Sequence, residues 1–185
     1  EVRQARASFS FMMRESRKYR LVEPPERGGG AMWDIGCYAV STLRMVFESE
    51  PESAFTIAKY VESGADITAN GVLDFGNGRR ANFDISFECA RHSEYEVTGT
   101  RGGLKCHATW QLPGDIPVIS WWTEDGREYV ERLKPANHFN LEIEAFNSFI
   151  TEGTAPTISL SDSKSNVRTI VACLRSAAEG RLVKV

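Results

Sequence analysis

The pattern that most constrains the fold is an alternation of apolar and polar residues that runs from residue 51 to about 134. A period of two is typical of strands with one buried face. Turn signals such as Ser63-Gly64 and Gly76-Asn77-Gly78 interrupt the alternation. The pattern therefore predicts a mainly antiparallel sheet of six or more strands. The strands expected in this region cover 53–61, 67–76, 79–89, 94–100, 103–110, 116–123 and 127–134.

The residues on either side of the alternating region predict the elements that cover the sheet. Apolar residues recur there at helical spacing, and glycine or proline lies at the expected ends. Because a sheet with one apolar face must be covered, we expect an α+β fold, with a large, mainly antiparallel open sheet and helices packed on one face. The elements expected are helices over 31–48, 138–152 and 161–179, strands over 5–14 and 181–185, and an exposed loop over 15–29.

Size and composition indicate one globular domain without a nucleic-acid or membrane partner. A chain of 185 residues is about the length of a single domain. Its net charge of −3 does not favour binding to nucleic acid, and it contains no apolar run of 18 residues. The four cysteines lie far apart, without the spacing of a zinc site, so we expect reduced thiols, no bound metal and a cytoplasmic location.

Residues 28 to 40 read GGGAMWDIGCYAV and place an acid and a phenol in an otherwise apolar segment. Residues four apart share a helix face, so Asp34 and Tyr38 are expected side by side. Two interpretations are open. Either Asp34 is only a helix-start carboxylate and Tyr38 a packed aromatic with a solvated hydroxyl, or the glycines let a ligand approach and the phenol beside the carboxylate exchanges a proton with a substrate hydroxyl. The segment lacks the G-x-G-x-x-G spacing of a dinucleotide site.

Four segments resemble the second domain of the Gfo/Idh/MocA oxidoreductases, the family of glucose-fructose oxidoreductase and inositol dehydrogenase. YRLVEPPERGGGAMWDIGCYAVSTLRMVFESEP is similar to the family's GGG-x-L-x-D-x-G-x-[HY] stretch. EVTGTRGGL, NHFNLEIEAFNSFI and DSKSNVRTIVACLRSAAEGRLVKV follow in the family's order and resemble its "GT-x-G-x-L" element, its "E-x-x-x-F" helix and its closing helix and strand. The similarity covers nearly the whole chain. Tyrosine at position 38, where other members often have histidine, makes the chain similar to the glucose-fructose oxidoreductase and dihydrodiol dehydrogenase branch of the family.

The resemblance implies that residues 1–185 are one carboxy-terminal domain of an NAD(P)-dependent oxidoreductase that acts on a sugar, polyol or diol hydroxyl. This domain would bind substrate and support oligomerisation. The family's amino-terminal Rossmann domain, which binds NAD or NADP and supplies the lysine of a Glu-Lys-Pro motif, has no counterpart in this sequence. We therefore expect the fragment to bind no cofactor and to be inactive without its own Rossmann domain.

The resemblance also implies roles for individual residues. Tyr38 matches the position implicated in proton transfer at the substrate hydroxyl, and Asp34 matches the acid that orients the substrate or its acid–base partner. Arg20, Gly30 and His138 are the candidates for substrate binding. A solvated basic loop for Arg20 and a helix-start histidine for His138 are the alternative interpretations.

The competing hypothesis for the whole chain is a non-catalytic module with the same fold that serves self-association or ligand sensing. In both cases the uncovered face of the sheet is expected to be partly apolar. Burial of that face against a second copy would give a homodimer or a tetramer. The small-molecule partner expected for the enzyme is sugar-like.

Overall fold

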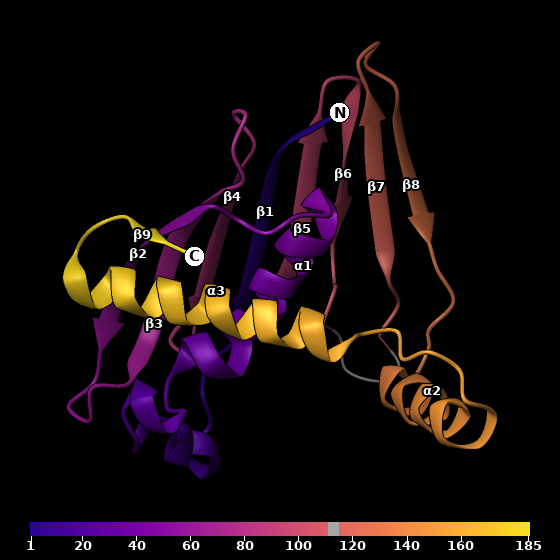
Figure 1. Ribbon diagram of the computed structural model, residues 1–185. Coiled ribbons are helices and arrows are strands. Elements are labelled where there is room, and N and C mark those ends of the chain that lie inside the picture. Colours follow the sequence, from indigo (N-terminus) through magenta and orange to yellow (C-terminus); the bar gives the residue numbers. More distant parts are fainter. Residues whose placement is uncertain (111–114) are drawn as a thin grey trace.

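The computed structural model describes residues 1–110 and 115–185. It contains a nine-stranded open sheet in the order β8-β7-β6-β5-β1-β4-β3-β2-β9 (Figure 1). The prediction of an α+β fold with a large sheet is confirmed. The strands are β1 (Val2–Ser10), β2 (Ser53–Tyr60), β3 (Asp66–Asp74), β4 (Arg80–Ser86), β5 (His92–Gly99), β6 (Gly102–Cys106), β7 (Val118–Thr123), β8 (Glu128–Arg132) and β9 (Val183–Lys184).

The amino-terminal strand lies in the interior of the sheet. β1 is inserted between β5 and β4, so that Ala7 is opposite Tyr95 on one side and Phe83 on the other. The β1–β4 pair is parallel, and the other pairs in the described sheet are antiparallel. The sheet is therefore mixed but mainly antiparallel, as the alternating sequence predicts.

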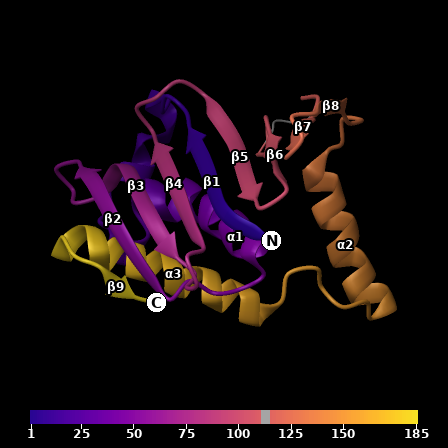
Figure 2. The ribbon, with the colours of Figure 1, turned by 90° about the horizontal axis from the view of Figure 1, so that it is seen from above.

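Two helices, α1 (Cys37–Phe47) and α3 (Leu160–Glu179), cover one face of the sheet (Figures 1 and 2). Small side chains on the central strands allow the helices to approach closely, and Ala7, Ala69 and Ala81 are fully buried. Removal of apolar surface from water stabilises this layer by about 25 cal/mol per Å². Larger side chains in the same core include Leu43, Phe47, Leu73, Phe75, Phe83, Ile85 and Ile170.

The helix α2 (His138–Glu152) has the predicted bounds but does not join the core. The side chain of Asn137 starts it by accepting hydrogen bonds from the backbone N–H groups of Phe139 and Asn140. None of its 15 residues, all of which the structure describes, is buried. The helical pattern specifies an apolar face, but the element that covers this face does not follow from the pattern. The expectation that helices pack on the sheet therefore holds for α1 and α3 and is wrong for α2.

The segment between β1 and α1 is partly helical, whereas the sequence predicts a loop over 15–29. It contains two short 3₁₀ helices, η1 (Glu15–Leu21) and η2 (Pro25–Arg27). The helix predicted over 31–48 begins as a π-helix, η3 (Met32–Gly36), and continues as α1. π turns inside helices occur frequently at functional sites. The π-helix η3 contains Asp34 and ends two residues before Tyr38.

Most of the predicted strands are shorter or shifted by a few residues in the structure, and three examples illustrate this. The strand predicted over 5–14 spans Val2–Ser10, and the strand predicted over 103–110 ends at Cys106. The predicted terminal strand contributes only Val183–Lys184 at the sheet edge. Alternation of side chains extends beyond the hydrogen-bonded ladder, so it does not mark where strand pairing stops.

Candidate functional site

The side chains of Arg20 and Asp34 form an ion pair between η1 and η3. The Arg20 guanidinium, near the end of η1, donates a hydrogen bond to the Asp34 carboxylate in η3. Both side chains are about three-quarters buried, so the pair is partly removed from solvent. Partial burial strengthens such an ion pair relative to one in water, provided that its geometry is maintained. The structure thus joins two of the residues that the sequence analysis selects.

A polar pocket of about 420 Å³ surrounds this pair. Arg20, Gly30 and Asp34 line it, which places three of the five predicted site residues around one space. The remaining described lining residues are Tyr19, Glu23, Arg27, Gly28, Gly29 and Trp33. Cationic, anionic and backbone polar groups therefore converge on a space large enough for a small polar molecule.

Tyr38 lies on the first turn of α1 and is not among the described residues that line this pocket, but the charges of Asp34 and Arg20 act on its phenol. Its side chain is 48% exposed, so the phenol is accessible from solvent. The ring makes edge contacts with Phe9 and lies 6.2 Å from the ring of Trp110. Burial and the nearby charges of Cys37 and Asp34 raise the pKa of Tyr38. The phenol is consequently protonated at neutral pH and available as a hydrogen-bond donor.

The other predicted contact residue, His138, lies at the start of α2. Its ring packs against the adjacent ring of Phe139, with the centroids 4.1 Å apart, and the residue is exposed. It is not among the described residues that line the polar pocket. A substrate role for His138 remains a prediction.

The sequence analysis missed Asp66, the first residue of β3. Its carboxylate Oδ2 accepts the backbone N–H of Met32 at 2.7 Å, at the start of η3. Asp66 is completely buried, and this burial raises its pKa to about 6. A single aspartate at the start of a strand gives no sign of burial, so the sequence carries no signal that would have identified it.

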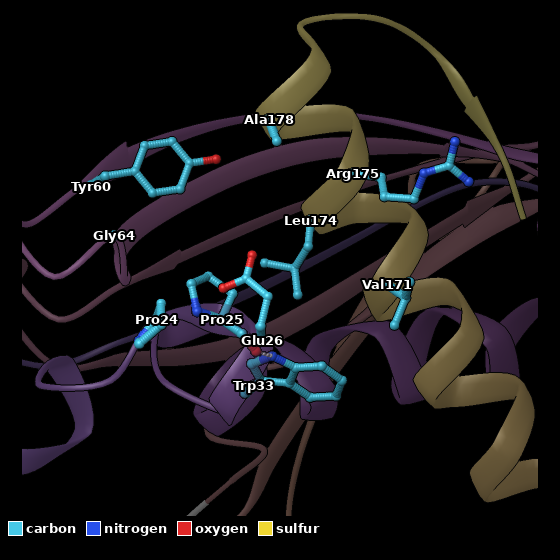
Figure 3. Close-up of a pocket in the computed structure, with 10 residues that line it drawn as sticks. All are labelled: Pro24, Pro25, Glu26, Trp33, Tyr60, Gly64, Val171, Leu174, Arg175 and Ala178. Carbon is cyan, nitrogen blue, oxygen red and sulfur yellow. Dashed lines mark hydrogen bonds between the residues drawn. The ribbon is translucent and has the colours of Figure 1, made fainter.

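A second, more apolar pocket of about 500 Å³ is lined by Pro24, Pro25 and Glu26 together with residues of α3 (Figure 3). Leu174 and Val171 of α3 face Trp33 across it. The indole Nε1–H of Trp33 donates a hydrogen bond of 2.7 Å to the carbonyl oxygen of Pro25, which fixes the ring as a wall shared by both pockets. Trp33 thereby separates an apolar space from the polar space beside Asp34.

The described residues contain neither a metal-binding cluster nor a helix that could span a membrane. No group of three or more His, Cys, Asp or Glu side chains in residues 1–110 and 115–185 could hold a metal ion. None of the helices in those residues combines the length and apolar character needed to cross a membrane. The four cysteines are unpaired thiols.

Comparison with known proteins establishes the family. The GFO/IDH/MocA C-terminal domain family matches residues 1–105, which is more than half of the chain. The chain belongs to the GFO/IDH/MocA family. The GFO/IDH/MocA match includes Arg20, Gly30, Asp34 and Tyr38, whereas His138 lies beyond it. The resemblance noted from the sequence motifs is thus confirmed.

Two curated relatives in this family match most of the chain. The chain is 28% identical over 179 residues to D-xylose 1-dehydrogenase (NADP(+)) 2 of Haloferax volcanii. The matched region covers 97% of the chain and 55% of the relative. The chain is 30% identical over 151 residues to trans-1,2-dihydrobenzene-1,2-diol dehydrogenase of Xenopus laevis. The matched region covers 78% of the chain and 46% of the relative. The chain therefore spans about half the length of the curated relatives that it matches.

Solved structures show the same fold. An aldose-aldose oxidoreductase from Caulobacter crescentus, complexed with glycerol, superposes with a TM-score of 0.85 at 23% identity, over 100% of this chain and 56% of that chain. The 3-ketoreductase KijD10 from Actinomadura kijaniata, in complex with NADP, gives a TM-score of 0.77 at 22% identity, over 97% of this chain and 54% of that chain. The chain therefore has the same fold as about half of each of these two oxidoreductase structures.

Proposed function

We propose that the chain is the substrate-binding and oligomerisation domain of an NAD(P)-dependent oxidoreductase that acts on a sugar, polyol or diol hydroxyl. The observation that carries this proposal is the Arg20–Asp34 ion pair in a polar pocket, with the accessible phenol of Tyr38 one helical turn beyond Asp34. The family match and the relatives, which include a xylose dehydrogenase and a dihydrodiol dehydrogenase, support the substrate class.

In the proposed reaction Tyr38 handles the proton at the substrate oxygen. Its pKa is raised, so the neutral phenol donates a proton to the oxygen of a carbonyl substrate during reduction. In the oxidative direction the phenolate must accept the hydroxyl proton, which requires a cation that lowers the pKa of Tyr38. The charge of Arg20 lowers the pKa of Tyr38, but burial and the nearby anions raise this pKa by more. We expect the further cation to come from the Rossmann domain.

Asp34 and Arg20 orient the substrate in this scheme. A carboxylate accepts hydrogen bonds from substrate hydroxyls, and the guanidinium holds that carboxylate in one position. Orientation of a reacting group contributes strongly to rate, and a displacement of about 1 Å can cost about 10²-fold. Gly30 forms part of the pocket wall beside them.

The glycine turn itself does not fit a dinucleotide. Pyrophosphate groups bind the free backbone N–H groups at a helix N-terminus. Here the N–H of Met32 is occupied by the Asp66 carboxylate, and the N–H of Gly30 donates to the carbonyl oxygen of Arg20. A buried anion already occupies this helix start. We therefore assign NAD or NADP to the Rossmann domain and expect no activity from residues 1–185 alone.

The oligomerisation part of the proposal rests on the face of the sheet opposite α1 and α3 (Figure 2). Phe55, Ile57 and Val72 are exposed apolar residues of the neighbouring strands β2 and β3. They line a shallow groove of about 420 Å³ together with Arg6 and Asp84. A second copy that covers this surface would bury apolar area and give a symmetric dimer.

The test is kinetic and uses the full-length protein with NAD and with NADP. A screen of aldoses, polyols and diols should yield cofactor-dependent turnover. Replacement Tyr38→Phe should then lower kcat by about 10²- to 10⁴-fold with little change in KM, because the proton donor is lost. The control Tyr129→Phe changes a partly exposed tyrosine of β8 and should leave the rate unchanged. A wild-type rate in Tyr38→Phe would show that the proton-transfer role is wrong.

The exposed apolar residues of β2 and β3 also favour a second candidate, a non-catalytic module for self-association or ligand sensing. Sedimentation of the full-length protein separates the two. A dimer that dissociates in Ile57→Lys but shows no turnover of any sugar, polyol or diol with either cofactor would support the non-catalytic module.

A further inference from the structure

The buried carboxylate of Asp66 has an unusual environment. Oδ2 bonds to the Met32 N–H, whereas Oδ1 has no hydrogen bond of regular geometry among the described residues, although the backbone N–H groups of Ala31 and Asp66 lie near the carboxylate and favour its charged form. A buried oxygen without a hydrogen-bond partner costs free energy, because it has lost its contacts with water. The position of that oxygen therefore calls for a structural explanation.

Oδ1 lies directly against the backbone of Gly30. A Cβ atom at Gly30 would be only 2.0 Å from Oδ1 of Asp66, and Gly30 has a φ of +105°. Both the space and the backbone angle exclude other residue types. Gly30 and Asp66 are thus a matched pair, in which the absence of a side chain on one makes room for the carboxylate of the other.

Gly30 in turn is bonded to both members of the ion pair. Its N–H donates to the carbonyl oxygen of Arg20 at 2.9 Å, and its carbonyl oxygen accepts the N–H of Asp34 at 3.3 Å. A shift of the Gly30 backbone would therefore displace the two chain segments that hold the guanidinium and the carboxylate. The contact from Asp66 blocks this shift on one side, and its bond to Met32 fixes the residue two positions further on.

We propose that Asp66 is a positioning residue, which holds the Gly30 turn so that Arg20 stays paired with Asp34. Asp66 is not among the described residues that line the pocket, so it acts through the backbone of the turn. The expected effect of Asp66 on catalysis rests on the proposed function. The expected effect of Asp66 on the Arg20–Asp34 ion pair does not. The two can therefore be tested separately.

The test without substrate measures the ion pair by NMR. In ¹⁵N-labelled protein at low temperature the Arg20 guanidinium Nη–H signals, assigned with Arg20→Lys, should exchange slowly with solvent because Nη1 donates a hydrogen bond to Asp34. Asp66→Ala should accelerate this exchange at least tenfold, and Asp66→Asn, which keeps an acceptor for Met32, should retain most of the protection. Unchanged exchange in folded Asp66→Ala would overturn the proposal.

Ser176→Ala is the matched control for lost stability. The Ser176 hydroxyl is fully buried and accepts the backbone N–H of Thr56 at 2.9 Å, far from the glycine turn in the chain. Its loss should lower the melting temperature, as Asp66→Ala does, but should leave the Arg20 exchange rate unaltered. Equal acceleration in Ser176→Ala would mean that general destabilisation, and not the turn, controls the pair.

The kinetic test uses the full-length enzyme. Asp66→Ala should lower kcat by about 10- to 100-fold with KM changed less than about threefold, and Asp66→Asn should recover most of the rate. Ser176→Ala should keep the wild-type kcat. Intact kcat in Asp66→Ala would overturn the catalytic part of the proposal. Absence of turnover in the wild type would instead refute the proposed function, and the NMR result would still decide the role of Asp66.

Discussion

Arg44 of α1 donates a hydrogen bond of 2.9 Å to Asp162 in the first turn of α3. The same guanidinium makes two bonds of 2.7 Å to Glu50, which follows α1. The Arg44 side chain is only 4% exposed, whereas both carboxylates are partly accessible to water. One buried cation thus joins the two helices that cover the sheet.

Replacement of Arg44 by alanine should destabilise the fold by about 2 kcal/mol. A hydrogen bond to a charged group contributes about 1.5–3 kcal/mol, and the carboxylates left behind regain some hydration because they lie near the surface. The quantity to measure is the free energy of unfolding in urea. Arg127→Ala is the control, because the Arg127–Asp125 pair is exposed and should contribute less than about 1 kcal/mol. Equal losses in both variants would contradict a special role for Arg44.

The parts of the fold that follow from local chemistry were predictable from the sequence. The spacing of apolar residues gave all three long helices to within about two residues, except where η3 widens the start of α1. The capping residues Asn137 and Ser159 and the terminal Gly153 and Gly180 mark the ends of α2 and α3. Local signals of this kind depend only on neighbouring residues, so a single sequence contains them.

The parts that depend on distant partners were not predictable. The insertion of β1 between β4 and β5 joins residues about 80 positions apart, and alternation cannot specify a neighbour. The site shows the same limit. The spacing of Asp34 and Tyr38 is visible in the sequence. The Asp66 carboxylate, in contrast, belongs to β3 and contacts Gly30 and Met32, and it lies 34 positions beyond Met32 in the chain. Their contact becomes visible only in the folded chain.

The pKa of Asp66 predicts that stability depends on pH. The pKa is about 6 in the fold and 3.8 in its ordinary range, so folding favours the protonated acid. This contribution is fully present below about pH 4 and is lost as pH rises through 6. Wild type should lose up to about 3 kcal/mol of unfolding free energy relative to Asp66→Asn between pH 4 and pH 8.

Urea unfolding of both proteins across this pH range gives the difference directly. Asp74→Asn, at the opposite end of β3, is the control for a partly exposed aspartate. A difference between wild type and Asp66→Asn that stays constant with pH would show that Asp66 does not titrate in this range.

The cysteines should differ strongly in reactivity at pH 8. Cys89 is exposed, whereas burial and the charge of Asp34 raise the pKa of Cys37 to about 11, and burial raises that of Cys173 to about 12. Thiolates are the reactive species, so iodoacetamide should modify Cys89 first. Peptide mass mapping over time measures each rate, and Cys89→Ser should remove the fast phase. Rapid modification of Cys37 would mean that its surroundings are more open than the structure shows.

The exposed position of α2 predicts that its apolar residues contribute little to the stability of the 185-residue chain. Phe146 is 60% exposed, whereas Phe47 is 6% exposed and stacks on Phe75 with ring centroids 4.4 Å apart. Phe47→Ala should therefore cost about 3–5 kcal/mol in urea unfolding, and Phe146→Ala less than about 0.5 kcal/mol. If Phe146→Ala costs as much as Phe47→Ala, α2 must pack against the core in solution. If it does not, the stripe on α2 is a surface available to another part of the full-length protein.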